Sequence, residues 1–168
     1  ISIAASPRKL ALIVLCLAAL VGCGWQTVRL NSTWQNNVTL WNHVLPINPD
    51  AFQGHVTLQA YYAKTGDLER AYFHRQEFAR IMNFASTWLQ AARDARRLGH
   101  HVDVPGHYEN AIKVASQRNP REYVIHTEYA RYLASVGYPE QALLEYEAIL
   151  LKNPPTAGTL RQEMARLR

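Results

Sequence analysis

The residues best suited to chemistry gather in one short stretch that follows a glycine. Three histidines and an aspartate lie there, and imidazole and carboxylate groups are ligands that Zn²⁺ binds in proteins. Their spacing matches no zinc ligand set that we can justify, and the sequence has no second cluster of this kind. We therefore expect a solvated insertion loop without a metal and keep a zinc site as the less favoured hypothesis. The residues are His100, His101, Asp103 and His107.

A basic patch precedes this stretch at the end of a predicted helix. It consists of Arg93, Arg96 and Arg97, together with His100. Cations at the C-terminal end of a helix complement its dipole. We interpret the patch as a solvated face, and the functional alternative is a contact for an acidic partner or for lipid headgroups.

No arrangement of residues in the sequence indicates catalysis. It contains no nucleophile–base pair, glycine-rich phosphate loop or paired acid motif that we recognise, and its remaining histidines stand singly. The net charge of +5 is mild, and no run of five basic residues is present, so nucleic-acid binding is not expected. We predict that this chain is not an enzyme and needs no cofactor.

The N-terminal segment is apolar enough to cross a bilayer. Residues 10–28 carry no charge, and nineteen residues in a helix span about 28 Å. Arg8 and Lys9 precede the segment, and no Lys or Arg occurs between Arg29 and Lys64. The positive-inside rule therefore predicts a cytoplasmic stub and one membrane-spanning helix over 1–30, in contact with the lipid bilayer. It places this helix in the inner (cytoplasmic) membrane and the C-terminal domain in the periplasm or another extracytoplasmic space.

A lipoprotein signal is the alternative interpretation of this segment. Residues 20–23 read Leu-Val-Gly-Cys and match a bacterial lipobox, in which Cys23 would be lipidated after cleavage. The Ser/Gly spacer that usually follows is missing, so we favour the uncleaved span. Cys16 lies on the same helix face, too distant from Cys23 for a disulfide. We interpret both cysteines as packing residues.

Small residues in this helix favour contact with another transmembrane helix. Small side chains let two helices approach closely within a bilayer. Gly and Pro are absent from residues 25–45, which predicts a stiff or slightly bent connection to the next helix. The small residues are Ala18, Ala19, Gly22 and Gly24.

Three glycines mark an internal repeat in the rest of the chain. Gly66, Gly99 and Gly137 are separated by 33 and 38 residues, and each follows apolar residues at a spacing of three or four. Ala71 and Ala142 lie five residues after the first and the last of these glycines. The pattern predicts helical hairpins that turn at the glycines and pack closely at small residues.

The segment 123–154 resembles the tetratricopeptide repeat, a helix–turn–helix unit of 34 residues. The segments 50–83 and 86–120 depart from this pattern. The first has Arg75 and Phe78 at unusual positions, and the second has about four extra turn residues and Tyr108 in place of a small alanine. The resemblance implies an α-solenoid over 31–155 with a capping helix over 156–168. The matching residues in 123–154 are Tyr129, Ala130, Leu133, Gly137, Ala142, Tyr146 and Pro154.

The resemblance also implies that the chain binds other proteins. We expect a membrane-anchored scaffold, a subunit or terminal segment of a larger membrane complex. Its partners would contact both the transmembrane helix and a groove formed by the first helices of the hairpins. The side chains expected to be exposed in that groove are His55, Gln59, Arg93, Arg96, His126 and Arg131.

The junction between the apolar helix and the repeats resembles the end of GT-C-type glycosyltransferase-like membrane proteins that carry tetratricopeptide tails. The resemblance implies an alternative, in which the chain is the non-catalytic tail of a polytopic enzyme. No catalytic residue of that family has a counterpart here. The residues that carry it are Thr27, Arg29, Trp34, Leu40, Trp41, Asn48 and Pro49.

Taken together, these patterns predict an all-α chain in which one transmembrane helix precedes a solenoid of hairpins. We expect helices near residues 9–30, 33–46, 51–65, 68–82, 85–98, 106–118, 122–136, 139–152 and 157–167.

Overall fold

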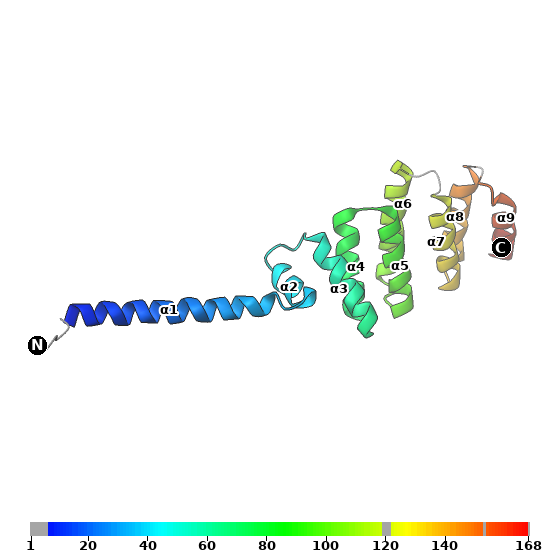
Figure 1. Ribbon diagram of the computed structural model, residues 1–168. Helices are drawn as coiled ribbons and strands as arrows, with labels where there is room; N and C mark the ends of the chain where they lie inside the picture. Colours follow the sequence, from blue (N-terminus) through cyan, green and yellow to red (C-terminus); the bar gives the residue numbers. More distant parts are fainter. Residues whose placement is uncertain (1–6, 119–121, 153, 168) are drawn as a thin grey trace, which may run out of the picture. The chain divides into compact units, whose positions relative to one another are not determined.

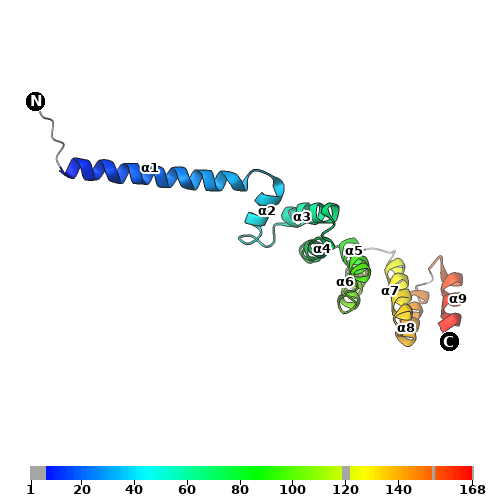
Figure 2. The ribbon, with the colours of Figure 1, turned by 90° about the horizontal axis from the view of Figure 1, so that it is seen from below.

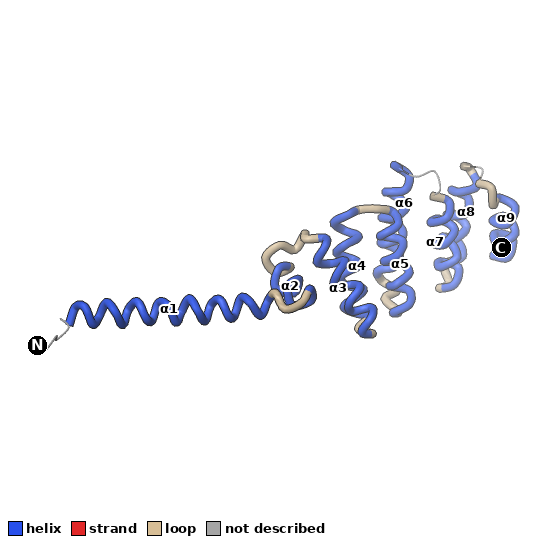
Figure 3. The backbone as a smooth tube through the Cα atoms, in the orientation of Figure 1, coloured by secondary structure: helices blue, strands red, loops and turns tan. Residues whose placement is uncertain are grey.

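A computed structural model describes residues 7–118, 122–152 and 154–167, and within them every regular element is a helix (Figure 3). The predicted all-α fold is thereby confirmed. The chain divides into two compact units, residues 1–57 and 58–168. The stub residues 1–6 and parts of the predicted repeats, namely 119–121 and Asn153, lie outside the described residues. The helices are α1 (Pro7–Thr33), α2 (Asn37–Val44), α3 (Phe52–Thr65), α4 (Leu68–Met82), α5 (Ala85–Leu98), α6 (Asp103–Arg118), α7 (Tyr123–Ser135), α8 (Pro139–Leu150) and α9 (Ala157–Leu167).

Helix α1 is a long apolar helix (Figure 1). The side chains of residues 7–31 are exposed. Its segment Pro7–Asn31 is long and apolar enough to cross a membrane, and none of its most apolar stretch is buried. Leu15 and Val21 expose about 70% of their surface. Exposed apolar surface of this extent is typical of an interaction site for a membrane or for another protein.

The predicted stiff connection after α1 is wrong, because the chain leaves the helix at Trp34 and starts a new one at Asn37 (Figure 2). Asn36 caps the start of α2. Its Oδ1 accepts a hydrogen bond from the backbone N–H of Thr39 at 2.9 Å, and the Thr39 hydroxyl accepts one from the backbone N–H of Asn36 at 3.4 Å. This reciprocal capping box fixes a helix start without any glycine or proline.

The three repeat glycines end their helices in the left-handed conformation. Gly66, Gly99 and Gly137 have φ angles of 85°, 83° and 88°. Glycine adopts this region without the steric cost that a Cβ would bring. After two of these glycines the next backbone N–H closes the turn: that of His100 donates to the Ala95 carbonyl, and that of Tyr138 to the Leu133 carbonyl, both at 2.9 Å. These are the bonds of a Schellman motif, so the predicted turns are confirmed.

In the second unit, α5 and α6 pack side by side as a hairpin, and α7 and α8 form the next one (Figures 1 and 2). Helix α4 packs against α5, α6 against α7, and α9 against α8. Alanine has a short side chain, so these helices approach closely, as the spacing predicts. The buried alanines are Ala71, Ala79, Ala91, Ala92, Ala95, Ala111, Ala115, Ala130 and Ala142.

The start of α2, at Asn37 rather than near 33, differs most from the predicted boundaries. The start of α6 also differs, at Asp103 rather than near 106. Pro105 is compatible with this start, since the first turn of a helix has no partner for its backbone N–H groups. The turn between α5 and α6 therefore contains only residues 99–102. The prediction of a solvated loop is wrong for His107, which is helical and only 8% exposed.

Candidate interaction surface

Arg93 and Arg131 occupy equivalent positions, each six residues before a turn glycine. Arg93 binds the first helix of the following hairpin, and Arg131 binds the terminal helix. Arg93 on α5 donates to Glu128 on α7, with Nε 3.0 Å from Oε2. Arg131 on α7 donates to Glu163 on α9, with Nε 3.1 Å from Oε2. Both pairs also have a second contact, so the carboxylates are held by two guanidinium nitrogens each. The two arginines are exposed as predicted, but several of their N–H donors are already used in hydrogen bonds within the chain.

Arg96 is exposed and lies between two tyrosines. Its guanidinium carbon is 5.4 Å from the centre of the Tyr132 ring, and its NH1 donates to the Tyr108 hydroxyl at 3.2 Å. A guanidinium over an aromatic face gains electrostatic attraction without being neutralised. The positive charge of Arg96 therefore stays available to a ligand.

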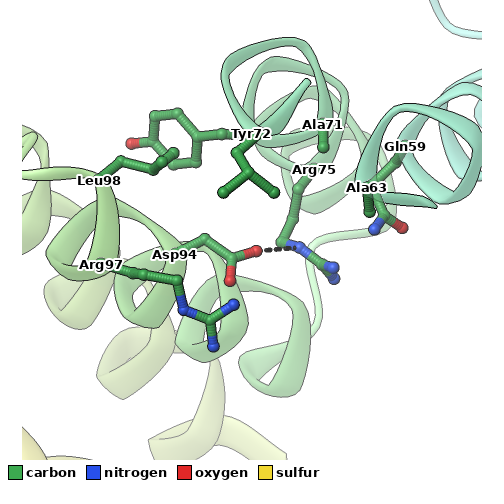
Figure 4. A pocket seen from close by; sticks show the side chains of 9 residues that line it. Gln59, Ala63, Ala71, Tyr72, Arg75, Asp94, Arg97 and Leu98 are labelled. Atoms are coloured by element: carbon green, nitrogen blue, oxygen red, sulfur yellow. Dashed lines mark ion pairs between the residues drawn. The ribbon is translucent and has the colours of Figure 1, made fainter. Parts of the chain in front are cut away.

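His126 and Gln59 are only partly exposed. His126 is held by the next helix, with its Nδ1 2.6 Å from Oε2 of Glu145. Gln59 lines a small cleft of about 80 Å³ beside Arg75 and Asp94 (Figure 4). The Nε of Arg75 lies 2.5 Å from Oδ2 of Asp94, an ion pair without hydrogen-bond alignment.

The prediction that His55 is exposed is wrong. This side chain is 3% exposed, and its Nε2 lies 2.9 Å from the backbone carbonyl oxygen of Pro49. The reason is local: the chain before α3 folds back so that a carbonyl oxygen meets the imidazole six residues later, which satisfies a buried polar group. His55 therefore cannot grip a ligand as its position on the helix predicted.

The four residues of the zinc hypothesis are divided among three hydrogen-bond partners, Glu69, Tyr132 and Tyr72. His100 lies 2.8 Å from Glu69, and His101 lies 3.3 Å from the Tyr132 hydroxyl. Asp103 and His107 both contact the hydroxyl of Tyr72. No group of three His, Cys, Asp or Glu side chains arranged for a metal occurs in the part of the chain that the structure describes. The geometry therefore gives the zinc hypothesis no support.

Tyr72 is the centre of a partly buried polar cluster. Its hydroxyl donates to Asp103 Oδ2 at 3.1 Å, accepts from Gln76 Nε2 at 2.7 Å, and lies 2.9 Å from His107 Nε2. Burial, and then the hydrogen bond to Asp103, raise the pKa of Tyr72 far above its usual range. Burial also lowers the pKa of His107, with Asp103 acting in the opposite direction. At neutral pH the side chains of Tyr72 and His107 are therefore both uncharged. The hydrogen bonds of this cluster connect α6 to α4.

Two adjoining cavities lie where the ends of α5 and α7 meet the turns that follow them. We call the first, of about 380 Å³, the arginine cavity. The second, of about 660 Å³, is the tyrosine cavity. Both are lined by His101, Tyr132 and Val136. The other residues of the arginine cavity are Arg93, Arg96, Arg97 and Ser135, and those of the tyrosine cavity are Val102, Pro105, Glu109, Tyr129, Leu133, Tyr138 and Gln141.

The sequence prediction found the arginines of this surface but missed its aromatic part. Tyr129 and Leu133 were identified only as residues that match the repeat, and Tyr132 and Tyr138 were not considered. The sequence did indicate the exposure of Tyr138. This tyrosine directly follows the turn glycine Gly137, and a side chain at such a turn lies at the surface.

The four small residues of α1 all lie on the exposed surface of that helix. A Cβ added at Gly22 or Gly24 would meet no atom within 4 Å. Cys16 and Cys23 are free and exposed. Larger side chains at these positions would therefore disturb nothing in the described chain. Substitutions there can test for contacts between α1 and another molecule.

Comparison with known proteins yields no relative: no family model and no curated protein matches this chain. Its function must be argued from the geometry alone.

Proposed function

We propose that this chain is a membrane-anchored scaffold of tetratricopeptide-like hairpins that binds other proteins in an extracytoplasmic space. The observation that carries the proposal is the combination of a wholly exposed apolar helix, α1, with successive hairpins that turn at Gly66, Gly99 and Gly137. A helical array of this kind offers long surfaces to partners. Its apolar helix supplies the attachment to the bilayer.

The scaffold belongs to a larger membrane complex, as a subunit or as the terminal segment of a polytopic protein. Support comes from α1, where Ala18 and Gly22 lie one turn apart on the same face and are not covered by any part of the chain that the structure describes. Close approach of a second helix at such a face gains van der Waals contact that lipid does not supply.

The test replaces these two residues with leucine. The Ala18→Leu, Gly22→Leu chain should lose its partner during purification in mild detergent, whereas Cys16→Leu, on the opposite side of the helix, should keep it. Mass spectrometry of the co-purified material identifies the partner. A monomeric wild-type chain, or unchanged co-purification of the double variant, would contradict the proposal.

The second candidate is the non-catalytic tail of a GT-C-type glycosyltransferase, favoured by the residues of the junction after α1, such as Trp34, Leu40 and Trp41. The coding sequence upstream of Ile1 decides between the two. Many further apolar spans with an early acidic loop would establish the enzyme tail, and a nearby start codon would exclude it.

A further inference from the structure

The arginine cavity carries more positive charge than the chain neutralises. Of its three guanidinium groups, that of Arg93 is paired with Glu128. Arg96 contacts only neutral tyrosines among the contacts described above. Arg97 lines this cavity and also the cleft that contains Asp94 (Figure 4), and no ion pair joins it to a carboxylate within the described residues. Two arginines therefore line this cavity without an ion pair to a carboxylate, an arrangement that attracts an anion.

Arg96 is also held in place for such a ligand. The Tyr132 ring and the Tyr108 hydroxyl fix its guanidinium, and Tyr108 is fully buried. A guanidinium has five N–H donors, and only one is used by Tyr108. Because its planar fork is already oriented, a carboxylate can bind it with little loss of side-chain entropy.

The tyrosine cavity offers apolar surface directly beside this charge. Val102 is 93% exposed, and Val136 and Tyr138 are also exposed at its rim. The cavity contains one carboxylate, that of Glu109. Exposed valines and a tyrosine around a cavity gain free energy when an apolar group covers them, which is typical of a binding surface.

Tyr132, His101 and Val136 line both cavities, so one ligand can enter the two together. We infer that these cavities form a single site for a short acidic–apolar segment of a partner protein. A carboxylate of the segment binds Arg96 and Arg97, and an adjacent aliphatic or aromatic side chain fills the tyrosine cavity. This inference rests on the proposed scaffold function and places the partner at the turns rather than only in the groove of the first helices.

A site with adjacent charged and apolar parts favours a peptide over a lipid surface. A bilayer surface attracts cations that extend freely into the headgroups. Arg93 is instead tied to Glu128, and Arg96 is tied to its tyrosines.

The test uses the full chain in phosphatidylcholine nanodiscs and a fluorescein-labelled peptide in which glutamates flank a Leu-Phe pair. Fluorescence anisotropy should show saturable binding that weakens as NaCl is raised, because salt screens the charges. Arg97→Gln and Tyr138→Ser should each weaken binding about five- to tenfold. Serine is a favourable residue at position 138, the N-cap of α8, so the second variant keeps its fold.

The matched control is Arg161→Gln, an exposed arginine of α9 outside both cavities, which should bind like the wild type. Equal affinity for a peptide with glutamine in place of glutamate, or for the Arg97→Gln chain, would overturn the site. Arg97-dependent binding to phosphatidylglycerol vesicles without peptide binding would also overturn it, in favour of lipid headgroups. If the peptide fails to bind while co-purification still depends on Ala18 and Gly22, the site is wrong and the scaffold function stands.

Discussion

His100 and His101 are neighbours in the chain, yet their rings stack on tyrosines of different hairpins. The ring of His100 lies 5.1 Å from that of Tyr72 on α4, with an interplanar angle of 10°. The ring of His101 lies 6.2 Å from that of Tyr132 on α7, with an angle of 14°. Through these two ring contacts, the turn after Gly99 connects α4 of the preceding hairpin with α7 of the following hairpin. Its histidines therefore have a structural role.

The first prediction concerns the coupling between His101 and Tyr132. A double-mutant cycle with His101→Ala and Tyr132→Leu should give a coupling free energy of about 0.5–1.5 kcal/mol, the value for an aromatic pair. Urea unfolding in mild detergent, followed by circular dichroism, measures it. His43→Ala, at an exposed position of α2, should leave the unfolding midpoint unchanged. A coupling of zero would show that the stacking contributes nothing.

The second prediction compares the two inter-helix carboxylates. Glu163 accepts from Arg131 and also from the Tyr146 hydroxyl at 2.7 Å, whereas Glu128 pairs with Arg93 alone among the described contacts. Glu163→Ala should cost about 1–3 kcal/mol, because it leaves the hydroxyl of the buried Tyr146 without this acceptor.

Glu128→Ala is the matched comparison and should cost only about 0.2–1 kcal/mol, as exposed ion pairs do. Urea unfolding of both variants gives the difference. In a Tyr146→Phe background the difference in free energy of unfolding between the two variants should be smaller, because Glu163 then has no hydroxyl to accept from. Equal losses in the original background would contradict the assigned role of Tyr146.

Most helix boundaries could be predicted from the sequence because local signals and packing agree there. The second unit has left-handed glycines at three of its turns, and alanines at helical spacing mark the buried faces. The break after α1 was predicted too early in the chain, between residues 30 and 33, because Asn36 and Thr39 fix the start of α2 with side-chain hydrogen bonds, without a glycine or proline. The early start of α6 was missed because Pro105 was expected to precede the helix rather than to lie in its first turn.

The candidate site was less predictable, because its contacts join residues far apart in the sequence. Arg93 and Arg96 were recognised as exposed cations on one face of a helix. Their partners Glu128 and Tyr132 lie on another helix, so only the packing of hairpins reveals which arginine is neutralised. Burial of His55 depends likewise on the path of the chain around Pro49, which helical periodicity does not describe.

The third prediction is a pH dependence that arises from His107. Burial lowers the pKa of this histidine in the folded chain below its usual value of 6.5. The unfolded chain therefore takes up the proton first as the pH falls, and the free energy of unfolding decreases below about pH 6.5. The His107→Gln chain should lose this part of the decrease.

Urea unfolding at about pH 8 and about pH 5.5 tests this expectation. His43→Gln, which removes an exposed histidine, serves as the control and should keep the wild-type slope. If His107→Gln and wild type lose stability equally over this range, His107 does not carry the dependence.

The fourth prediction concerns Gly54 in the first turn of α3. A Cβ built on this glycine would lie 2.8 Å from Trp41 Cε3 and 2.9 Å from Leu45 Cδ2. Gly54→Ala should therefore cost about 1–3 kcal/mol through overpacking in this part of the chain. Gly106→Ala, in the first turn of α6 with open space around it, should instead stabilise by about 0.5–1 kcal/mol. The two variants should shift the urea midpoint in opposite directions, and a shift in the same direction would contradict the packing around Gly54.

The last prediction tests the placement of the membrane helix and the lipoprotein alternative together. In a chain with Cys16→Ala and Cys23→Ala, we expect unchanged membrane association, because the apolar surface of α1 supplies it rather than a lipid on Cys23. A single new cysteine, Val102→Cys, then reports the side on which the second unit lies, since residue 102 is in an exposed turn. A membrane-impermeant maleimide should label it from outside intact spheroplasts, as the positive residues Arg8 and Lys9 predict. Labelling only after lysis would place the unit in the cytoplasm, and release of the double alanine variant from the membrane would favour lipidation at Cys23.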